Sequence, residues 1–383
     1  MREKKQGLQT ADLPTGRAVA PLARNEPPTG AAGQSPELAV IDWAAPRSAL
    51  LHWYDQHARD LPWRRTRDPY AIWVSEVMLQ QTRVETVIPY YLRFLARFPS
   101  ALTLADAELD DVLAHWSGLG YYRRARLLHQ GARAVVRDHG GLMPRDALLR
   151  RSLPGIGAYT AGAIGSIAFD LPEPIVDGNV ARVLARVLCI ETPLGERATE
   201  RVLWQQAARL AEGERPGVLN QALMELGARV CVPVNARCGA CPLAGVCQAR
   251  RLDRVDELPL AAKKKKPVPV QLVALVARAS DGKVWLARSE GSLFGGLWGC
   301  PLEPGTGRKN ASALSERTGL TGTLSKKQLG AVTHVLTHRA LSVDVYGLSQ
   351  AEGREHASLK KLADSELTSL GIATLTRKIL ASI

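Results

Sequence analysis

A short glycine-containing turn, Leu153-Pro-Gly-Ile-Gly157, joins two segments with helical apolar spacing. Helices are expected over residues 145–151 and 158–169. Gly155 and Gly157 permit positive φ, and they leave backbone N–H groups uncovered where the second helix begins. Uncovered amides at a helix N-terminus bind phosphate. The turn therefore predicts a helix-hairpin-helix that grips a DNA backbone, and an ordinary turn between two helices is the alternative at this point.

The chain is long and strongly basic. Its 383 residues exceed what one hydrophobic core usually holds, so two or three domains are expected. The formal net charge is +13, and residues 46–266 carry 31 basic and 23 acidic side chains. Most of the basic residues are arginines, which bind phosphate through paired hydrogen bonds, so a polyanionic partner is favoured. A basic surface that is only solvated is the alternative.

Composition divides the chain into four segments. Residues 1–45 mix Pro, Gly, Ala and both charges without a period, which indicates a flexible tail. Residues 46–252 show helical spacing throughout and predict an all-α domain. Residues 253–269 contain four consecutive lysines between prolines and predict a basic linker. Residues 270–383 predict a smaller α+β domain.

The C-terminal segment changes to two-residue spacing near its start. Alternating apolar residues begin at Val268, residues 280–282 form a Ser-Asp-Gly turn, and residues 284–288 return as the second strand of a hairpin. A second alternating run spans residues 334–346, and residues 359–383 have helical spacing. The fold class is therefore multidomain, with an all-α helix-hairpin-helix core followed by a smaller α+β domain.

Four of the six cysteines are clustered. No apolar run could cross a bilayer and no signal core follows the N-terminal lysines, so we expect an intracellular protein with reduced thiols. The location that we expect is the cytoplasm of a bacterium, in association with the nucleoid. Cys231, Cys238, Cys241 and Cys247 form a C-x6-C-x2-C-x5-C pattern in the loop 231–247. Thiolates at this density can close on one metal centre, and the spacing leaves a [4Fe–4S] cluster and a structural zinc both open.

A carboxylate is predicted on the apolar face of a helix. Asp68-Pro69 predicts a helix start, with Asp68 as the cap. Glu76 follows at helical spacing from Ile72 and shares the face of that residue. A carboxyl group among apolar side chains has a raised pKa, as a general acid near neutral pH requires. The alternative is a structural salt bridge from Glu76 to an arginine such as Arg64.

A second carboxylate, Asp177, precedes a predicted helix and suits its N-cap position. A cap at a helix N-terminus tends to stay ionised. An ionised carboxylate beside a protonated one is the pairing used to cleave a glycosidic bond through an oxocarbenium-like state. Glu76 and Asp177 are therefore candidates for the acid and the ion stabiliser.

Two further segments are candidates for contact with nucleic acid. Residues 82–85 (Thr-Arg-Val-Glu) match a capping box, which would leave Gln80 and Gln81 exposed at a bend between helices. The loop of residues 118–124 places aromatic rings and guanidinium groups among glycines, suited to stacking on a base and gripping phosphates.

Together these residues resemble the MutY-type adenine DNA glycosylases. The resemblance rests on five motifs in the same order, and it covers roughly residues 46–266, with a weaker match to the C-terminus. The motifs are WVSEVMLQQT (73–82), GLGYY (118–122), LPGIGAYTAGAI (153–164), VDGNV (176–180) and the cysteine quartet.

The resemblance implies that adenine opposite 8-oxoguanine or guanine is flipped from double-stranded DNA and cut from its sugar by a monomeric enzyme. Glu76 would protonate adenine at N7 and later assist water, and Asp177 would stabilise or trap the sugar cation. It further implies hydrogen bonds from Tyr159 and Asn179 to these carboxylates, an adenine pocket, residues that fill the stack or probe the opposite base, and a [4Fe–4S] cluster. The pocket residues would be Trp63, Arg64, Leu79, Val84 and Gln221, and the stack-filling or probing residues Gln80, Gln81 and Tyr121.

Tyr159 separates this chain from close relatives of that family. Endonuclease III-like glycosylases have a lysine at this point of the hairpin motif, which attacks the sugar and cuts the strand. A tyrosine cannot form a Schiff base, and Ala181 stands where some family members have a lysine. We expect a monofunctional enzyme. An endonuclease III-like glycosylase/lyase and a non-catalytic iron–sulfur DNA-binding protein are the alternatives.

The C-terminal segment resembles the Nudix-like domain with which this family reads 8-oxoguanine. True Nudix hydrolases need paired glutamates for Mg²⁺, and residues 315–319 offer only one, so pyrophosphatase chemistry is not expected. The family's Phe-Ser-His loop corresponds to Leu336-Thr337-His338. Thr337 and His338 can still contact the lesion, whereas the phenylalanine is lost. A metal site between His334 and His338 is not expected, because an alternating strand separates them.

Overall fold

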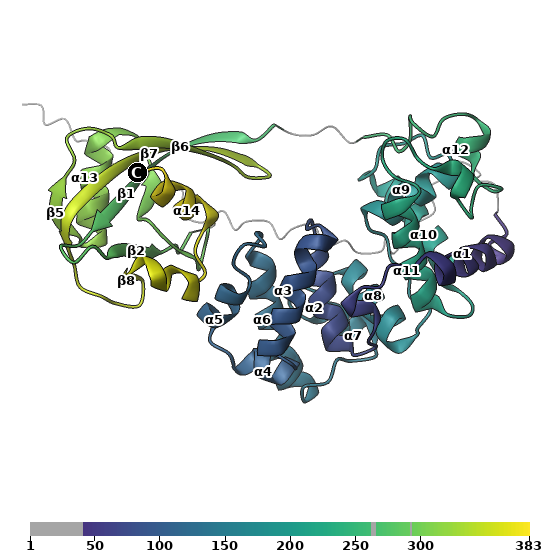
Figure 1. Cartoon of the computed structure of the whole chain (residues 1–383). Coiled ribbons are helices and arrows are strands. Elements are labelled where there is room, and N and C mark those ends of the chain that lie inside the picture. The colour runs from purple at the N-terminus through teal and green to yellow at the C-terminus, as the bar shows by residue number, and fades with distance from the viewer. Residues whose placement is uncertain (1–40, 262–265, 292) are drawn as a thin grey trace, which may run out of the picture.

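The protein, described here by a computed structural model over residues 41–261, 266–291 and 293–383, has a helical domain followed by a domain built on a sheet (Figure 1). The predicted tail lies outside the described residues as far as residue 40. Residues 41–45, the end of the predicted tail, belong to the helical domain. Trp43 is buried and its indole N–H donates to Gln206, so this domain begins before residue 46. Among the described residues, none of the helices has the length and apolarity needed to cross a membrane.

The helical domain packs around one apolar core, in which Trp73, Phe94 and Trp116 are fully buried. In Figure 1, α2–α7 gather at the centre of the view, and α1 lies with α9–α12 at the right. The α-helices are α1 (Ala44–His57), α2 (Pro69–Leu79), α3 (Val84–Arg97), α4 (Ala101–Asp106), α5 (Leu109–His115), α6 (Arg123–His139), α7 (Ala147–Ser152), α8 (Ala158–Phe169), α9 (Gly178–Val187), α10 (Arg197–Ala211), α11 (Pro216–Arg229) and α12 (Gln248–Arg251), with 3-10 turns η1 (Pro62–Arg64) and η2 (Cys238–Ala240).

Helix α2 is buried along almost its whole length. Asp68 caps it as predicted, because its carboxylate accepts hydrogen bonds from the backbone N–H groups of Tyr70 and Ala71. Every residue from Tyr70 to Met78 is buried. A carboxylate on this helix therefore lies in the core whichever face it occupies.

The predicted capping box at the start of α3 is wrong. The N-cap residue is Arg83, and no side chain caps the helix. The hydroxyl of Thr82 is already used, since it donates to the carbonyl of Gln80 and accepts from Arg124 Nη2 at 3.0 Å. The bend after α2 is held by this arginine and not by a local cap.

The hairpin between α7 and α8 forms as the sequence predicts, with two local differences. Helix α7 begins at Ala147 because Asp146 caps it by accepting from the N–H of Leu149. Gly155 has φ +79°, and a Cβ there would lie 2.8 Å from Leu127 Cβ. Gly157 has φ −90°, so it does not use the positive φ that glycine permits, and it is the extended N-cap of α8. Having no side chain, Gly157 leaves the first amides of α8 without a side-chain cap.

The C-terminal domain is a mixed sheet in the order β3-β2-β1-β7-β5, with β4 on β1, β6 on β7 and β8 on β2. The long strands β1 and β7 run parallel, and the other pairs are antiparallel. The elements are β1 (Val268–Arg278), β2 (Val284–Arg288), β3 (Trp298–Gly299), β4 (Leu302–Pro304), α13 (Gly307–Thr318), β5 (Thr321–Leu324), β6 (Gly330–Val335), β7 (Arg339–Glu352), β8 (Leu359–Leu362), η3 (Asp364–Ser369) and α14 (Thr374–Ala381).

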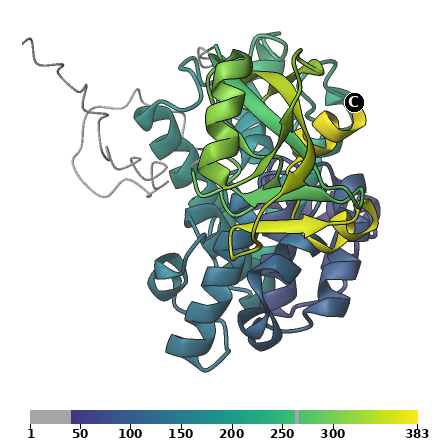
Figure 2. The same cartoon turned by 90° about the vertical axis from the view of Figure 1, so that its left-hand side faces the viewer.

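Helices cover both faces of this sheet. Alternate residues of β1 point to opposite sides, as strand geometry requires. Val273 packs in one apolar cluster with Leu314 of α13, and Leu272 packs in another with Leu375 of α14. Figure 2 shows α13 lying across the sheet.

Two strand predictions in this domain need correction. The alternating run at residues 334–346 is not one strand, because the chain turns at residues 336–338 between β6 and β7. Residues 359–362, predicted as helical, form β8 and pair with β2; α-helix begins only at Thr374. The turn at residues 336–338 contains no Gly, Pro, Asn or Asp, so the sequence there carries none of the usual turn signals.

Candidate active site

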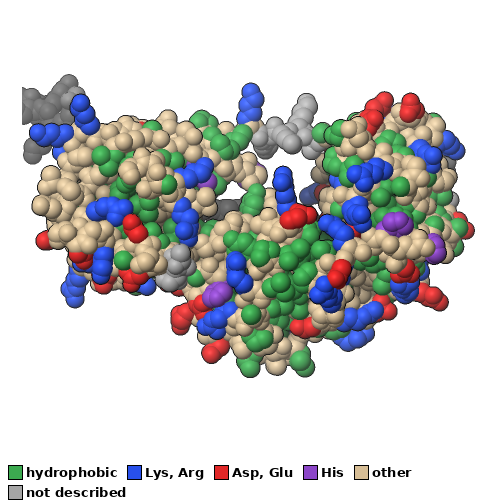
Figure 3. All heavy atoms as spheres, in the orientation of Figure 1, with side chains coloured by type: hydrophobic (Ala, Val, Ile, Leu, Met, Phe, Trp, Pro, Cys, Tyr) green, Lys and Arg blue, Asp and Glu red, His purple; other side chains and the backbone are tan. Residues whose placement is uncertain are grey.

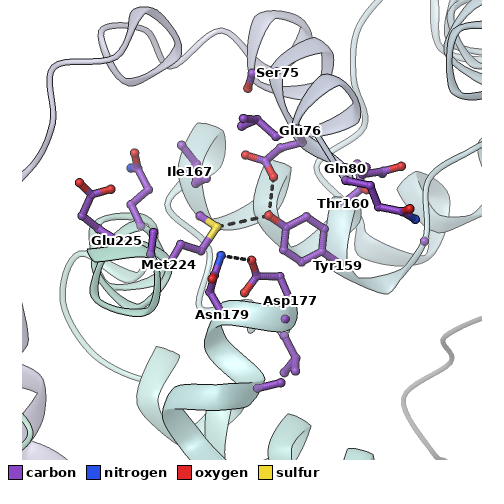
Figure 4. A pocket seen from close by; sticks show the side chains of 18 of the residues that line it. Ser75, Glu76, Gln80, Tyr159, Thr160, Ile167, Asp177, Asn179, Met224 and Glu225 are labelled. Carbon is purple, nitrogen blue, oxygen red and sulfur yellow. Dashed lines mark hydrogen bonds between the residues drawn. The ribbon is translucent and has the colours of Figure 1, made fainter. Parts of the chain in front are cut away.

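A large cavity of ≈ 820 Å³ lies in the helical domain. Its walls come from η1 and α2 on one side and from α9–α11 on the other, and the start of α8 borders it. Figure 4 shows Glu76 and Asp177 on opposite sides of the Tyr159 ring. All the residues predicted for chemistry and for the adenine pocket line this cavity, together with the two glutamines and both hairpin glycines: Glu76, Asp177, Tyr159, Asn179, Trp63, Arg64, Leu79, Val84, Gln221, Gln80, Gln81, Gly155 and Gly157.

Glu76 is 4 % exposed and has one close polar partner. The hydroxyl of Tyr159 donates to Glu76 Oε2 at 2.6 Å and also contacts Met224 Sδ at 3.2 Å (Figure 4). Burial raises the pKa of Glu76 to about 7, the charge of Asp177 adds to the rise, and the Tyr159 hydrogen bond and Arg64 oppose it. Glu76 can therefore exchange a proton near neutral pH.

The structural salt bridge between Glu76 and Arg64 does not form. Arg64 Nη2 instead bonds Glu225 Oε2 at 2.8 Å, and Arg59 Nε bonds the other oxygen at 2.7 Å. Burial raises the pKa of Glu225, but the hydrogen bonds from both arginines outweigh it and hold the pKa below its ordinary value. Glu225 thus remains an anion that neutralises the guanidinium of Arg64, whose charge also acts on Glu76.

Glu225 and Met224 are functional candidates that the sequence did not single out. Glu225 lies four residues after Gln221 on α11, so the two share a helix face. Glu225 is the one acidic residue of α11, which was the available signal, but its partners lie more than 160 positions earlier.

Asp177 caps α9 as predicted. Its carboxylate accepts from the N–H of Val180 at 2.7 Å and from Asn179 Nδ2 at 3.0 Å (Figure 4). Burial raises its pKa, and these hydrogen bonds and the charge of Arg182 oppose the rise. Of the two carboxylates, Asp177 is the one whose charged form the fold supplies with several hydrogen bonds.

The residues predicted to enter the base stack lie at exposed bends. Gln81 is exposed with φ +56° just after α2, whereas Gln80 is half-buried. Tyr121 is 49 % exposed with φ +48°. Its hydroxyl lies 3.4 Å from Thr337 Oγ1, in the turn between β6 and β7. The structure therefore brings Tyr121 and Thr337 together, outside the cavity, with His338 exposed in the same turn.

Arg124 does not grip phosphate, contrary to the interpretation of its loop. It is 9 % exposed, and its Nη1 donates to the carbonyls of Val77 and Met78 at 2.8 and 2.9 Å. Its guanidinium also lies under the ring of Tyr121, 5.4 Å from the centroid. Arg124 therefore closes the C-terminus of α2 and supports Tyr121.

The four clustered cysteines are half-buried and line one small cavity next to α9. Arg186 Nη1 lies 3.3 Å from Cys231 Sγ. In the described ranges no three metal-ligating side chains are close enough to hold a single ion. One zinc ion would draw four sulfurs to about 2.3 Å from its centre. Four cysteine side chains around one cavity supply the number and kind of ligands that an iron–sulfur cluster takes, with one thiolate for each iron.

Comparison with known proteins identifies both domains and the family of the chain. Residues 74–209 match the family described as HhH-GPD superfamily base excision DNA repair protein, and residues 273–382 match the NUDIX domain. The mouse protein named adenine DNA glycosylase is 40% identical over 368 residues, covering 81% of this chain and 72% of its own. The human protein of that name is 36% identical, covering 89% and 74%. The solved structure of a thermostable thymine-DNA glycosylase, 29% identical, has a TM-score of 0.48 and covers 54% of this chain and 95% of its own. With relatives this similar over most of both chains, the protein belongs to the adenine DNA glycosylase family of base excision repair proteins.

Proposed function

We propose that this protein hydrolyses the N-glycosidic bond of adenine that is mispaired with 8-oxoguanine or guanine in double-stranded DNA. The observation that carries the proposal is the pair of carboxylates, Glu76 and Asp177, in one cavity beside the helix-hairpin-helix. The volume of ≈ 820 Å³ admits a flipped nucleotide. Lys and Arg side chains stand around the hollow between the two domains (Figure 3), as a duplex partner requires.

Glu76 acts as the general acid in this proposal. Its carboxyl group gives a proton to adenine N7 while the bond between the sugar C1′ and N9 breaks, and the bonding electrons leave with the base. The sugar becomes an oxocarbenium-like cation, which the carboxylate of Asp177 stabilises. Water then adds to C1′ and returns a proton to Glu76. Tyr159 and Asn179 position the two carboxylates through the hydrogen bonds described above.

We propose that the enzyme leaves the DNA strand uncut. Tyr159 stands where a strand-cleaving relative would need a lysine, and its hydroxyl is engaged with Glu76. A burial-raised pKa keeps that hydroxyl protonated. Borohydride should therefore trap no covalent adduct between protein and DNA, and a trapped adduct would favour a lyase.

The base pocket and the opposite-base contacts divide between the two domains. Trp63, Arg64, Leu79, Val84 and Gln221 surround the flipped adenine in this proposal. Gln80, Gln81 and Tyr121 fill the space left in the stack, and Thr337 and His338 contact the opposite base. Leu336 lacks the ring that the family's phenylalanine supplies, so the preference for 8-oxoguanine rests on the other contacts.

We propose that Cys231, Cys238, Cys241 and Cys247 hold a [4Fe–4S] cluster, and that the protein acts as a monomer because one chain completes the cavity. When bound, the cluster would supply a rigid, charged centre, around which the four cysteines would hold the loop 231–247 in place for contact with DNA. Iron and sulfide analysis should give four of each per chain, and Cys238→Ser should lower both, whereas Cys189→Ser should not.

The central experiment is a single-turnover assay on duplexes with adenine opposite 8-oxoguanine, guanine or cytosine. Glu76→Gln should abolish adenine release and retain duplex binding, because the amide keeps the shape and loses the proton. Glu85→Gln is the matched control, since Glu85 is exposed on α3. Adenine release by Glu76→Gln at the normal rate would show that another group is the acid.

A further inference from the structure

The two domains make a direct contact through α5. Leu113 of α5 is fully buried and belongs to the same apolar cluster as Leu297 and Ala373 of the C-terminal domain. Gly371 lies directly against Leu113, because a Cβ at position 371 would lie 2.6 Å from Leu113 Cβ and 3.3 Å from Leu297 Cδ2. Figure 1 shows α5 beside the lower edge of the sheet domain. The contact is therefore packed like a domain interior.

One carboxylate joins this contact to the sheet. Asp110 Oδ1 accepts from Arg288 Nη2 at 2.8 Å, and its Oδ2 lies 3.4 Å from the indole Nε1 of Trp298. Trp298 is itself 1 % exposed and lies under the ammonium of Lys360, 4.9 Å away. Asp110 therefore contacts donors on two residues of the C-terminal domain, and it fixes the orientation of the two domains as well as their distance.

Two more hydrogen bonds cross the same contact. The hydroxyl of Tyr122 donates to the carbonyl of Ile372 at 3.1 Å, and Arg377 Nη2 donates to Ser117 Oγ at 3.3 Å. Tyr122 directly follows Tyr121 in the chain. The loop that carries the exposed Tyr121 is therefore tied to the C-terminal domain at its next residue.

The turn between β6 and β7 depends on this arrangement. Phe294 packs against the apolar clusters of both domains, and its ring centroid lies 6.1 Å from that of His334 in β6. Thr337, three residues later in the turn, lies 3.4 Å from the hydroxyl of Tyr121. That separation is at the limit for a hydrogen bond, so a small shift of one domain breaks the contact.

We propose that the α5 contact is a preformed dock between the domains, and that Asp110 and Gly371 are positioning residues that set how selectively the enzyme acts opposite 8-oxoguanine. The dock holds the turn of residues 336–338 at a fixed place over Tyr121 before DNA arrives. Neither residue lines the active-site cavity, so the dock acts on the reading of the opposite base and not on the chemistry. The proposal rests on the proposed adenine excision.

The test compares single-turnover rates of adenine release opposite 8-oxoguanine and opposite guanine. Asp110→Asn removes the charge that Arg288 faces, and Gly371→Ala pushes α5 away from Leu297. Asp110→Asn should lower the ratio of the two rates by about tenfold or more, as expected for one lost charge-assisted hydrogen bond. Gly371→Ala should lower the ratio too, because its added methyl group displaces α5, and both variants should leave the rate opposite guanine within about twofold. Asp110→Glu keeps the charge and should retain more of the ratio.

Asp111→Asn is the matched control. Asp111 lies on the same turn of α5 but pairs with Arg97 and His115 inside the helical domain, so its ratio should not change. Thermal unfolding checks that each variant is folded. An unchanged ratio in both dock variants would overturn the inference and leave adenine excision standing. A parallel fall of both rates would assign the contact a structural role only, and would overturn it equally. No adenine release by the unaltered protein would refute the proposed function instead.

Discussion

The hydrogen bond from Tyr159 to Glu76 makes a quantitative prediction about the pH dependence of adenine release. Burial raises the pKa of Glu76, and the hydrogen bond from Tyr159 opposes this rise because it stabilises the carboxylate. The net pKa is about 7. A hydrogen bond to a buried charged group is worth about 1.5–3 kcal/mol. One pH unit corresponds to about 1.36 kcal/mol, so Tyr159→Phe should raise the pKa of Glu76 by about one to two pH units.

The sign follows from the role of the group. A general acid works in its protonated form, so the rate should fall as the pH rises through the pKa of Glu76. In the unaltered protein the midpoint of this fall should lie near pH 7. In Tyr159→Phe the midpoint should move to higher pH, while the plateau rate at low pH drops because the carboxyl group is no longer held in place.

The assay is the single-turnover rate of adenine release, measured from about pH 5 to about pH 10. Tyr70→Phe is the control, because Tyr70 is buried on the same helix as Glu76 but donates to the carbonyl of Phe98. A midpoint that stays in place in Tyr159→Phe, or moves to lower pH, would refute the assignment of Glu76 as the titrating acid.

Three further predictions concern the frame of the site. Asp177→Asn should keep the cap of α9, since an amide oxygen can accept from Val180, but should slow adenine release by about a hundredfold or more in single turnover. Glu225→Gln leaves Arg59 and Arg64 without their anion and should cost about 3–5 kcal/mol of the free energy of unfolding, measured with urea. Arg124→Met removes the hydrogen-bond donor of the carbonyl groups at the end of α2. It should lower both the melting temperature and the affinity for mismatched duplex.

The sequence predicts those parts of the site that are set by local spacing. Asp68 and Asp177 cap their helices as expected, because capping involves residues two or three positions away. The burial of Glu76 is also local in origin, since its helix is apolar over its whole length. The raised pKa follows from burial and needed no knowledge of the fold.

Residues with distant partners escaped prediction. Arg124 reads as a phosphate ligand in its glycine-rich loop, and only the fold shows that the end of α2 takes its donors. Arg124 also donates to the hydroxyl of Thr82, and this hydroxyl does not cap α3. The run at residues 334–346 reads as one strand because period-two spacing continues across a turn without glycine or proline. Its division follows from the parallel pairing of β7 with β1, which connects residues about 70 positions apart.

In the proposed function, two helices link the contact with DNA to catalysis. Helix α2 ends in the Gln80–Gln81 bend, and Glu76 lies four residues earlier, about 6 Å along the axis. Helix α8 begins at the hairpin, and Tyr159 lies in its first turn, hydrogen-bonded to Glu76. Each helix thus carries a DNA-facing residue at one end and a catalytic or positioning side chain within about one turn of it. If DNA binds as proposed, with its backbone at Gly155–Gly157 and Gln81 in the base stack, these two contacts fix the place where an extruded base meets Glu76, and no separate movement of the site is required.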